Sequence, residues 1–309
     1  MNRVAVILPA YNEEQTIVRV VQSFHSELPE ASIWVVNNHS LDQTESLAKK
    51  EIERLGCKGG VLNEYRQGKG NAIRRAFLEI EADIFILADA DLACPASEVH
   101  FLMTPIVKGE ADMVVGDRHT GGDYASQNKR ALHSFGNRLV RTLINRLFKA
   151  KLVDPMCGYR AFSRLFVKNY PILVEGFEIE TDMTLHALDK RFRIREVPIS
   201  FQDRPEGSVS KLNTFRDGAR VLRTIWNIFR YYRPLVFFGG AAIVFAVLGL
   251  LTSIPVWEDW FRDKYIHHIP LTILSSGLEI VALLLGAVGL ILDSIAHQDR
   301  RRFERDLMN

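Results

Sequence analysis

Two aspartates one residue apart, Asp89 and Asp91, stand just after the apolar run Ile84–Leu87. This run is rich in residues that favour β-strands, so it predicts a buried strand that brings two carboxylates to its C-terminal end. Open α/β sheets bind their ligands at that end of their strands. Carboxylate oxygens bind hard divalent cations, and a cation held there can hold a diphosphate. The alternative is an Asp-rich turn, and these residues alone do not decide between the two.

Strands and helices alternate on both sides of this pair and must position it. Short runs rich in β-formers predict strands at Val4–Leu8, Ser32–Val36, Val61–Leu62, Asp83–Leu87 and Asp112–Val115. Helical segments follow the first four strands, one ending near Glu27 and the others spanning Gln43–Leu55, Ala72–Glu81 and Val99–Val107. This alternation predicts an α/β fold with a doubly wound, mostly parallel sheet. The polar residues that follow each strand would then gather along one edge of the sheet.

Two later segments have the pattern of basic amphipathic helices. Lys129–Lys149 has apolar residues at helical spacing with basic residues between them, and Phe215–Tyr232 has a similar pattern. Such a helix lies on an anionic membrane surface or packs on the sheet with its arginines in water, and for the first segment both readings stay open. Between these segments we expect a turn and strand over Asp154–Phe162, a helix within Glu175–Leu188 and a strand over Arg193–Phe201.

The distribution of charge indicates an anionic partner. The 309 residues include 39 Lys and Arg against 37 Asp and Glu, a formal net charge of +2. Between Tyr124 and Val153, however, there are seven basic residues and no acidic one, and six basic residues over Lys211–Arg233 face only Asp217. Such blocks suit a lipid surface or a phosphate, although a solvated basic face has the same composition. We expect no nucleic-acid partner.

The length and the cysteines limit the organisation of the chain. A chain of this length holds one large domain with an appendage or two ordinary domains. Cys57, Cys94 and Cys157 are far apart in the sequence and form no CxxC pair. They indicate neither a disulfide framework nor a zinc site, which favours a cytosolic location for the catalytic part. The N-terminal apolar run Val4–Ala10 is too short for a signal peptide and is followed by acidic residues.

Two apolar segments near the C-terminus predict transmembrane helices. Leu235–Ile254 is uncharged over the roughly 20 residues that span a bilayer, and Leu271–Leu292 contains a single charged residue, Glu279. An acid within a span marks function or a helix–helix contact, and the scarcity of other polar residues favours the contact. Arginines flank the outer ends of the two spans, at Arg230, Arg233, Arg300, Arg301, Arg302 and Arg305.

The loop that we expect between the spans, Pro255–Pro270, holds three acids and two bases. By the positive-inside rule both termini and the large N-terminal domain are therefore cytoplasmic, at the inner (plasma) membrane. Trp257, Trp260 and Tyr265 suit the opposite membrane interface.

Five short motifs resemble those of family-two glycosyltransferases, in the same order and with similar spacing. They are VILPAYNEE at 6–14, GKGNA at 68–72, ADAD at 88–91, CGYRAF at 157–162 and RPEGSVSK at 204–211. Together with two C-terminal spans, they are most similar to the polyprenyl-phosphate glycosyltransferases. That group includes dolichyl-phosphate mannose synthase and the bacterial undecaprenyl-phosphate glucosyltransferases. The resemblance covers nearly all of the predicted cytoplasmic part.

This resemblance implies a Rossmann-like GT-A fold that binds a nucleotide-sugar donor at the strand ends. Mg²⁺ or Mn²⁺ would join Asp89 and Asp91 to the donor diphosphate. The implied donor-binding residues are Pro9, Tyr11, Glu14, Asn37, Asn38, Lys69, Asp89, Ala90 and Asp91. Asn37 and Asn38 replace the Asp-Asp pair of many members, which leaves a UDP-linked or GDP-linked donor open. Lys69 follows Gly68 in a turn that can approach a diphosphate or simply begin a helix.

The acceptor side can be argued from its chemistry. A polyprenyl phosphate already carries a nucleophilic oxygen near neutral pH, so no general base is required. The enzyme must instead bring two anions together, and arginines do so by bidentate contact, unless they are merely solvated at the surface. The basic and hydroxyl candidates are Arg118, Arg130, Arg204, Ser210 and Lys211. Glu180 and Asp182 position a sugar hydroxyl or assist at the acceptor, or else act only as acids at a helix N-terminus.

We therefore predict inverting transfer of a sugar from a nucleotide diphosphate to undecaprenyl or dolichyl phosphate at the cytoplasmic membrane face. The expected catalytic residues are Asp89, Asp91, Arg118 and Glu180. The alternatives are a glycan acceptor and a membrane-tethered nucleotide-sugar binding protein without turnover. The expected parts are a catalytic domain at 1–210, a juxtamembrane helix at 211–234, a membrane hairpin at 235–293 and a basic tail at 294–309. We expect a homo-oligomer in the bilayer, with a tetramer as the specific prediction.

Overall fold

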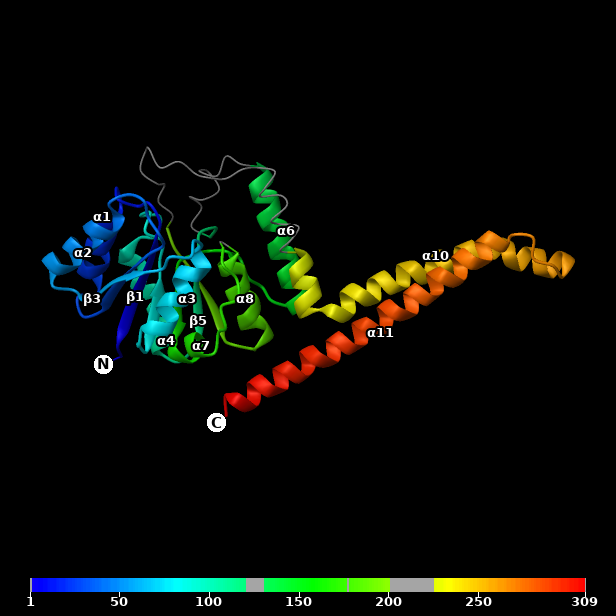
Figure 1. Cartoon of the computed structure of the whole chain (residues 1–309). Coiled ribbons are helices and arrows are strands. Elements are labelled where there is room, and N and C mark those ends of the chain that lie inside the picture. Colours follow the sequence, from blue (N-terminus) through cyan, green and yellow to red (C-terminus); the bar gives the residue numbers. More distant parts are fainter. Residues whose placement is uncertain (1, 121–130, 177, 201–224, 309) are drawn as a thin grey trace. The chain divides into compact units, whose positions relative to one another are not determined.

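The protein consists of two compact units, Met1–Val221 and Leu222–Asn309. The structure is a computed structural model and describes residues 2–120, 131–176, 178–200 and 225–308 (Figure 1). The first unit is built on a seven-stranded sheet, and the second contains two long helices. Each unit is described separately below.

The sheet of the first unit is mostly parallel. Its strands are β1 (Val4–Ala10), β2 (Ser32–Asn37), β3 (Lys58–Asn63), β4 (Ile84–Leu87), β5 (Met113–Asp117), β6 (Arg160–Ser163) and β7 (Ile194–Pro198). They lie in the order β3-β2-β1-β4-β6-β5-β7, and only β6 runs antiparallel to its neighbours. The predicted doubly wound fold is therefore confirmed. The C-terminal ends of the parallel strands share one edge, where Asn37 pairs with Ala10 on one side and with Asn63 on the other.

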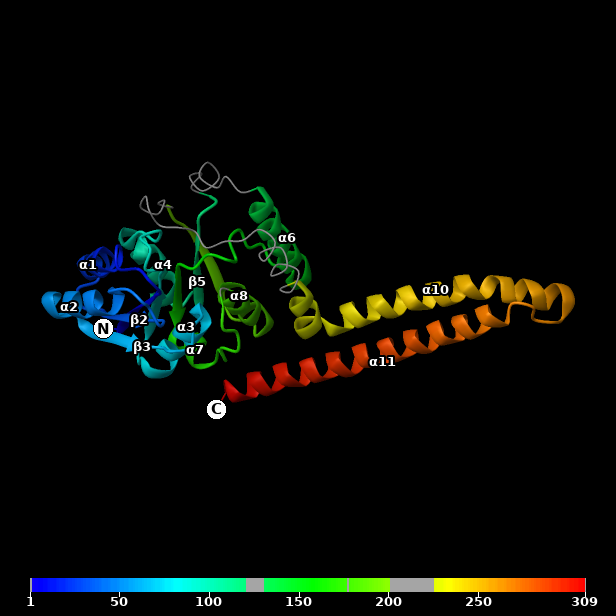
Figure 2. The same ribbon diagram turned by 45° about the horizontal axis from the view of Figure 1, so that its top comes forward.

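Helices pack on both faces of this sheet (Figures 1 and 2). They are α1 (Ile17–Glu27), α2 (Thr44–Leu55), α3 (Lys69–Glu79), the short 3-10 turn η1 (Ala96–Glu98), α4 (Val99–Val107), α6 (Ala131–Phe148), α7 (Arg164–Lys168) and α8 (Ile179–Asp189). An aromatic cluster forms part of the core, because Phe77 of α3 packs edge-on against Phe85 and Phe162, and Phe162 stacks on Phe166. The rings thereby fix α3 and α7 to β4 and β6.

The helices α3 and α7 depart from the prediction. The helix α3 begins at Lys69 rather than at Ala72, so Lys69 belongs to its first turn. The short helix α7 was not predicted from the sequence, and it begins where the Ser163 side chain accepts a hydrogen bond from the Phe166 N–H at 3.2 Å. A helix of five residues is too short to give a periodic pattern.

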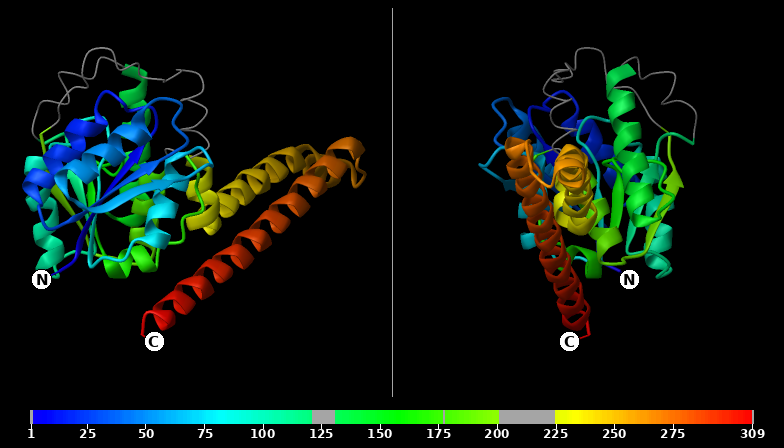
Figure 3. Two further views of the ribbon diagram at one scale, coloured as in Figure 1. Left: turned by 60° about the vertical axis from the view of Figure 1, so that its left-hand side comes forward. Right: turned by 90° about the vertical axis from the view of Figure 1, so that its right-hand side faces the viewer.

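The second unit contains the π-helical turn η2 (Ile228–Tyr232) and the helices α10 (Pro234–Asp263) and α11 (Ile269–Asp306), which pack antiparallel (Figure 3). Each predicted span lies within one of these helices, which are long and apolar enough to cross a membrane. The predicted loop Pro255–Pro270 is wrong in extent, because α10 continues through Pro255 to Asp263. A proline within a helix removes a single backbone donor, so the chain can kink and remain helical.

The actual connection between α10 and α11 is short and is closed by one buried carboxylate. Asp259 accepts hydrogen bonds from the backbone N–H groups of His267 at 2.8 Å and His268 at 3.0 Å. The Nδ1 atom of His268 lies 2.8 Å from the same carboxylate oxygen. Because α10 extends to Asp263, Trp257 and Trp260 lie on the helix and not on the predicted loop.

Small residues allow the two long helices to approach closely. A Cβ atom added at Gly249 of α10 would lie 2.6 Å from Glu279 Oε1 of α11. A Cβ added at Gly289 of α11 would lie 3.2 Å from the Cβ of Phe238. The expected helix–helix contact of Glu279 is therefore present, and its Oε1 atom is buried without a hydrogen-bond partner among the described residues. Close approach at small residues is the usual way in which membrane helices pack.

Candidate functional site

Lys69, Asp89 and Glu180 meet at the C-terminal edge of the sheet. The Lys69 Nζ atom contacts Asp89 Oδ1 and lies 2.5 Å from Glu180 Oε1. The side chains of Lys69 and Glu180 are 9% and 8% exposed, whereas that of Asp89 is 34% exposed. Burial disfavours the charged form of Lys69, but the two carboxylates outweigh this effect and raise its pKa. The Lys69 ammonium thus links Asp89, which follows β4, to Glu180 in the first turn of α8.

The turn that leads to Lys69 requires glycine for two reasons. Gly68 has a φ of 132°, a conformation that only glycine adopts without strain. A Cβ atom at Gly68 or Gly70 would also collide with the backbone oxygen of Glu175 or of Val174, respectively. The Gly70 N–H donates to the Glu175 oxygen at 2.9 Å. The start of α3 is therefore held against the segment that precedes α8.

Gly158 of the CGYRAF motif closes the other side of this ion cluster. A Cβ atom at this position would lie 3.0 Å from Asp89 Oδ2 and 3.1 Å from Lys69 Nζ. The backbone at Gly158 thus lies directly against the ion pair. The sequence motif marked this segment, but only the structure shows that its glycine makes room for Lys69 and Asp89.

The turn after β4 orients Asp91, which is 5% exposed. Its Oδ1 atom accepts a hydrogen bond from the Ala93 N–H at 3.1 Å. Thr16 donates its hydroxyl to the Ala90 carbonyl at 2.7 Å and so fixes the backbone between the two aspartates. The turn includes Leu92 with a φ of 65°.

The two aspartates fit a divalent cation that shares its ligands with a diphosphate. Among the described residues there is no cluster of three or more His, Cys, Asp or Glu side chains that would hold a metal by themselves. Mg²⁺ sites commonly use one or two carboxylates and take their remaining ligands from substrate phosphates and water. The partly exposed Asp89 and the hydrogen-bonded Asp91 match such a site.

Asn38 holds the loop that leads into α3. Its Nδ2 group donates to the carbonyl oxygens of Glu64 at 3.3 Å and Arg66 at 2.7 Å, and its Oδ1 atom accepts from the Gly68 N–H at 2.7 Å. A carboxylate has no hydrogen to donate to two carbonyl oxygens, which gives a local reason for Asn at this position. Asn37 donates to Asn63 Oδ1 at 2.9 Å. Both predicted donor-binding amides are thus engaged within the protein.

We expect Asn38→Asp to weaken binding of the nucleotide diphosphate by about tenfold. The variant loses two donated hydrogen bonds, each contributing about 0.5–1.5 kcal/mol, and places a negative charge beside two carbonyl oxygens. The loop before Lys69 would then lose its anchor. Calorimetric titration with UDP and with GDP measures the effect.

A matched control for this variant is Asn145→Asp. Asn145 ties a different loop in the same way, donating to the Leu152 carbonyl at 2.8 Å and accepting from the Leu152 N–H at 2.9 Å. This change should leave nucleotide affinity unaltered. Equal affinities of Asn38→Asp and the unmodified protein would contradict the role given to Asn38.

A polar hollow of about 280 Å³ lies at the ends of β2 and β3. Its lining consists of Asn37, His39, Ser40, Glu45, Asn63, Glu64 and Tyr65. Among these residues only Asn37 was predicted to bind the donor. Asn63 ends β3, and the others lie in loops or at the start of α2.

The predicted donor residues at the end of β1 lie along the same edge. Pro9 is within the strand, paired with Val36 of β2. Tyr11 follows the strand, and its hydroxyl accepts a hydrogen bond from Gln67 at 3.3 Å. Glu14 accepts from the Gln43 N–H at 3.0 Å and thereby helps to begin α2.

Arg118 forms a bidentate ion pair that the sequence did not suggest. Its Nε atom lies 2.7 Å from Asp154 Oδ2, and its Nη2 atom lies 3.1 Å from Asp154 Oδ1. The Asp154 side chain is 2% exposed, whereas the Arg118 side chain is 20% exposed. Asp154 therefore orients Arg118 at the end of β5. The other predicted acceptor residues, Arg130, Arg204, Ser210 and Lys211, lie outside the described residues.

Arg160 is fully buried beneath the site and was not identified from the sequence. Its guanidinium donates to the carbonyl oxygens of Cys157 at 2.8 Å and Pro155 at 2.7 Å, and to the Thr184 hydroxyl at 3.0 Å. Burial lowers the pKa of Arg160, although nearby acids, Glu180 first among them, counteract this. The sequence feature that could have identified Arg160 is its position as a charged residue within the otherwise uncharged CGYRAF motif.

Comparison with known proteins shows which family the chain is similar to. Residues 5–170 match the family Glycosyl transferase family 2. Glycosyltransferase AglJ of Haloferax volcanii is 26% identical over 304 residues, which cover 97% of each chain. Polyprenol monophosphomannose synthase of Mycolicibacterium smegmatis is 27% identical over 226 residues, covering 68% of this chain and 81% of the relative.

A solved structure shows the same fold. It is the crystal structure of glucosyl-3-phosphoglycerate synthase from Mycobacterium tuberculosis in complex with Mn²⁺, UDP and glucosyl-3-phosphoglycerate. The TM-score is 0.58 at 22% identity, over 74% of this chain and 79% of that chain. The family match spans more than half of the chain. The chain therefore belongs to glycosyl transferase family 2 and is a glycosyltransferase with a GT-A fold.

Proposed function

We propose that this glycosyltransferase transfers a sugar from a UDP- or GDP-linked donor to a polyprenyl phosphate, with inversion at the anomeric carbon. The observation that carries the proposal is the cluster of Lys69, Asp89 and Glu180 beside Asp91 at the ligand-binding edge of the sheet. Relatives whose names specify polyprenol or dolichyl phosphate as acceptor support the choice of acceptor.

On the donor side, Asp89 and Asp91 would hold Mg²⁺ or Mn²⁺ together with the diphosphate. When bound, the cation stabilises the negative charge that develops on the leaving nucleotide diphosphate. Lys69 lies in the first turn of α3 and contributes a positive charge at the same place. The polar hollow beside Asn37 lies at the same edge of the sheet and suits the nucleobase.

On the acceptor side, the phosphate is its own nucleophile. One of its oxygens forms a bond to the anomeric carbon from the face opposite the diphosphate, while the bond from that carbon to the diphosphate oxygen breaks. No proton has to move, so the protein needs cationic groups rather than a base. Arg118, held rigidly by Asp154, is the described candidate, and Arg130, Arg204, Ser210 and Lys211 remain predicted partners.

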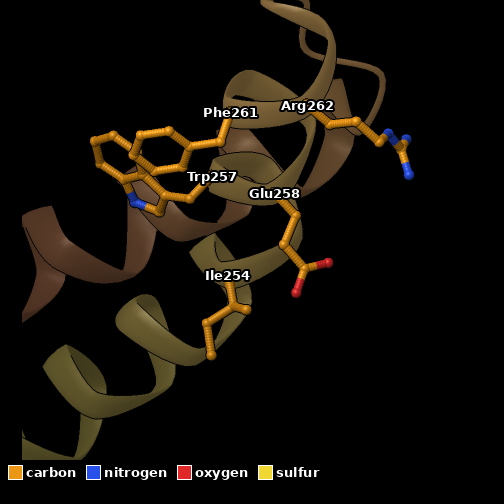
Figure 4. Close-up of a pocket in the computed structure, with 5 residues that line it drawn as sticks. All are labelled: Ile254, Trp257, Glu258, Phe261 and Arg262. Carbon is orange, nitrogen blue, oxygen red and sulfur yellow. The ribbon is translucent and has the colours of Figure 1, made fainter.

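We further propose that α10 and α11 form a membrane hairpin with both ends in the cytoplasm. Only 6% and 11% of their most apolar stretches are buried, unlike the core helix of a soluble protein. Arg300 of α11 donates to the Tyr232 carbonyl at 3.4 Å, so the arginine-rich ends lie together. Near the opposite end of α10, the rings of Trp257 and Phe261 stack with their centroids 6.1 Å apart, while the side chains of Glu258 and Arg262 point away from these rings (Figure 4). Aromatic and charged residues of this kind suit the far membrane interface.

A transfer assay tests the proposal. The purified full chain is incubated with UDP-, GDP- and CMP-sugars, Mg²⁺ or Mn²⁺, and undecaprenyl phosphate, and the lipid phase is analysed by mass spectrometry. We expect one nucleotide class to give a lipid-linked monosaccharide. Transfer to a glycan but not to the lipid, or nucleotide-sugar binding without turnover, would overturn the proposed acceptor or activity.

A further inference from the structure

We propose that Lys69 makes binding of the divalent cation depend on the donor diphosphate. In this view the Lys69 ammonium neutralises Asp89 until a donor diphosphate also pairs with that ammonium, so the cation binds poorly alone and well with the nucleotide. The inference rests on the proposed metal site at Asp89 and Asp91. It assigns to Lys69 a coupling role in addition to attraction of the donor.

The contacts of Lys69 are the first support. Its ammonium contacts the same carboxylate that would bind the cation, and the Lys69 side chain is only 9% exposed. Two cations that share one carboxylate repel each other strongly where little water screens them. A divalent cation alone would therefore have to compete with a positive charge that the protein already holds at Asp89.

The confinement of Lys69 is the second support. Gly158 lies against its Nζ atom on one side, and the Gly70 N–H bond to Glu175 fixes the start of α3 on the other. The ammonium therefore has few places to move. Glu180, at 2.5 Å, can keep it when Asp89 turns toward a cation.

The position of Lys69 at the start of α3 is the third support. The N-terminus of a helix favours an anion, so a diphosphate near this turn would attract the ammonium and supply ligands to the cation at once. Binding of the two ligands then becomes mutually favourable. By linkage, the cation must raise nucleotide affinity by the same factor as the nucleotide raises cation affinity.

The test is Mn²⁺ binding to the full-length protein in detergent, followed by electron paramagnetic resonance with and without UDP or GDP. Without nucleotide, Lys69→Met should bind Mn²⁺ about tenfold more tightly than the unmodified protein, because one competing positive charge is gone. The gain in Mn²⁺ affinity on adding nucleotide should shrink in Lys69→Met. Lys168→Met, which removes an ion pair with Glu81 elsewhere, should change neither value.

For a second variant, Glu180→Gln, we expect the opposite change in Mn²⁺ affinity. This variant also keeps the inference testable if Lys69→Met does not fold. Glu180→Gln leaves Asp89 as the remaining anionic partner of Lys69 within this cluster, so Mn²⁺ alone should bind more weakly than in the unmodified protein. Unchanged or weaker Mn²⁺ binding in a folded Lys69→Met would overturn the inference, as would unchanged or tighter binding in Glu180→Gln. Asp89→Asn tests the metal site separately from the coupling role of Lys69. If this variant binds Mn²⁺ as tightly as the unmodified protein, the proposed metal site is wrong. If it binds Mn²⁺ more weakly, the metal site is supported independently of the result for Lys69→Met.

Discussion

Asp91→Asn should lower the rate of sugar transfer by about 1000-fold while the protein still folds. Asn has nearly the same shape as Asp, and its carbonyl oxygen can still accept the hydrogen bond from the Ala93 N–H that now measures 3.1 Å. The turn after β4 should therefore keep its conformation. What is lost is one of the two negative charges proposed to hold the cation and diphosphate.

The measurement compares the turnover of the lipid-linked product with thermal unfolding of the same preparations. Asp83→Asn is the matched control, because Asp83 precedes the N-terminal end of the same strand and pairs with Arg3 at 3.6 Å, away from the ligand edge. It should retain nearly full turnover. Turnover of Asp91→Asn at the level of the unmodified protein would exclude Asp91 as a ligand in catalysis.

The sequence predicts β1, β2, β4 and β5 well because these strands are short apolar runs with polar residues at or just after their ends. Ile84–Leu87 is fully buried, and the two aspartates follow it in a turn as expected. The same pattern predicted a strand over Ser32–Val36, which ends one residue before the end of β2 at Asn37. These features are local, so a single stretch of sequence contains the information needed to find them.

The pairings within the site are not local and could not be read from the sequence. Lys69, Asp89 and Glu180 come from three separate segments and meet only through the strand order of the sheet. The ion pair of Arg118 with Asp154 likewise depends on a loop that follows α6. The sequence suggested that Arg118 binds phosphate, but its ion pair with Asp154 could be found only from the folded structure.

The α10 boundary was missed for a different physical reason. Pro255 and the charged residues after it indicate the end of a helix, yet the chain remains helical to Asp263. The carboxylate of Asp259 binds the two backbone N–H groups that begin the return of the chain, at His267 and His268. This contact spans eight or nine residues and stabilises a short turn that local propensity did not predict.

Arg160→Lys should destabilise the catalytic unit by about 3 kcal/mol, because a buried acceptor that loses its hydrogen bond costs about 1–3 kcal/mol. The planar guanidinium of Arg160 reaches Pro155, Cys157 and Thr184 at the same time. Lysine keeps the charge but concentrates its donors at one atom, so it cannot reproduce this three-way contact. We expect the melting temperature of the detergent-purified protein to fall by roughly 8 °C.

The same change should also weaken donor binding, since Arg160 holds the carbonyl of Cys157 and the next residue, Gly158, lies against Lys69 and Asp89. Arg193→Lys provides the control: the Arg193 guanidinium likewise makes several hydrogen bonds, here bidentate to the Asp112 carboxylate, but its side chain is 58% exposed. A partly exposed pair contributes little to stability, so this variant should melt within a degree or two of the unmodified protein. If Arg160→Lys melts no lower than Arg193→Lys, the buried arginine does not stabilise the loop beneath the site. If it melts lower but binds the nucleotide normally, Arg160 supports the fold without positioning Gly158.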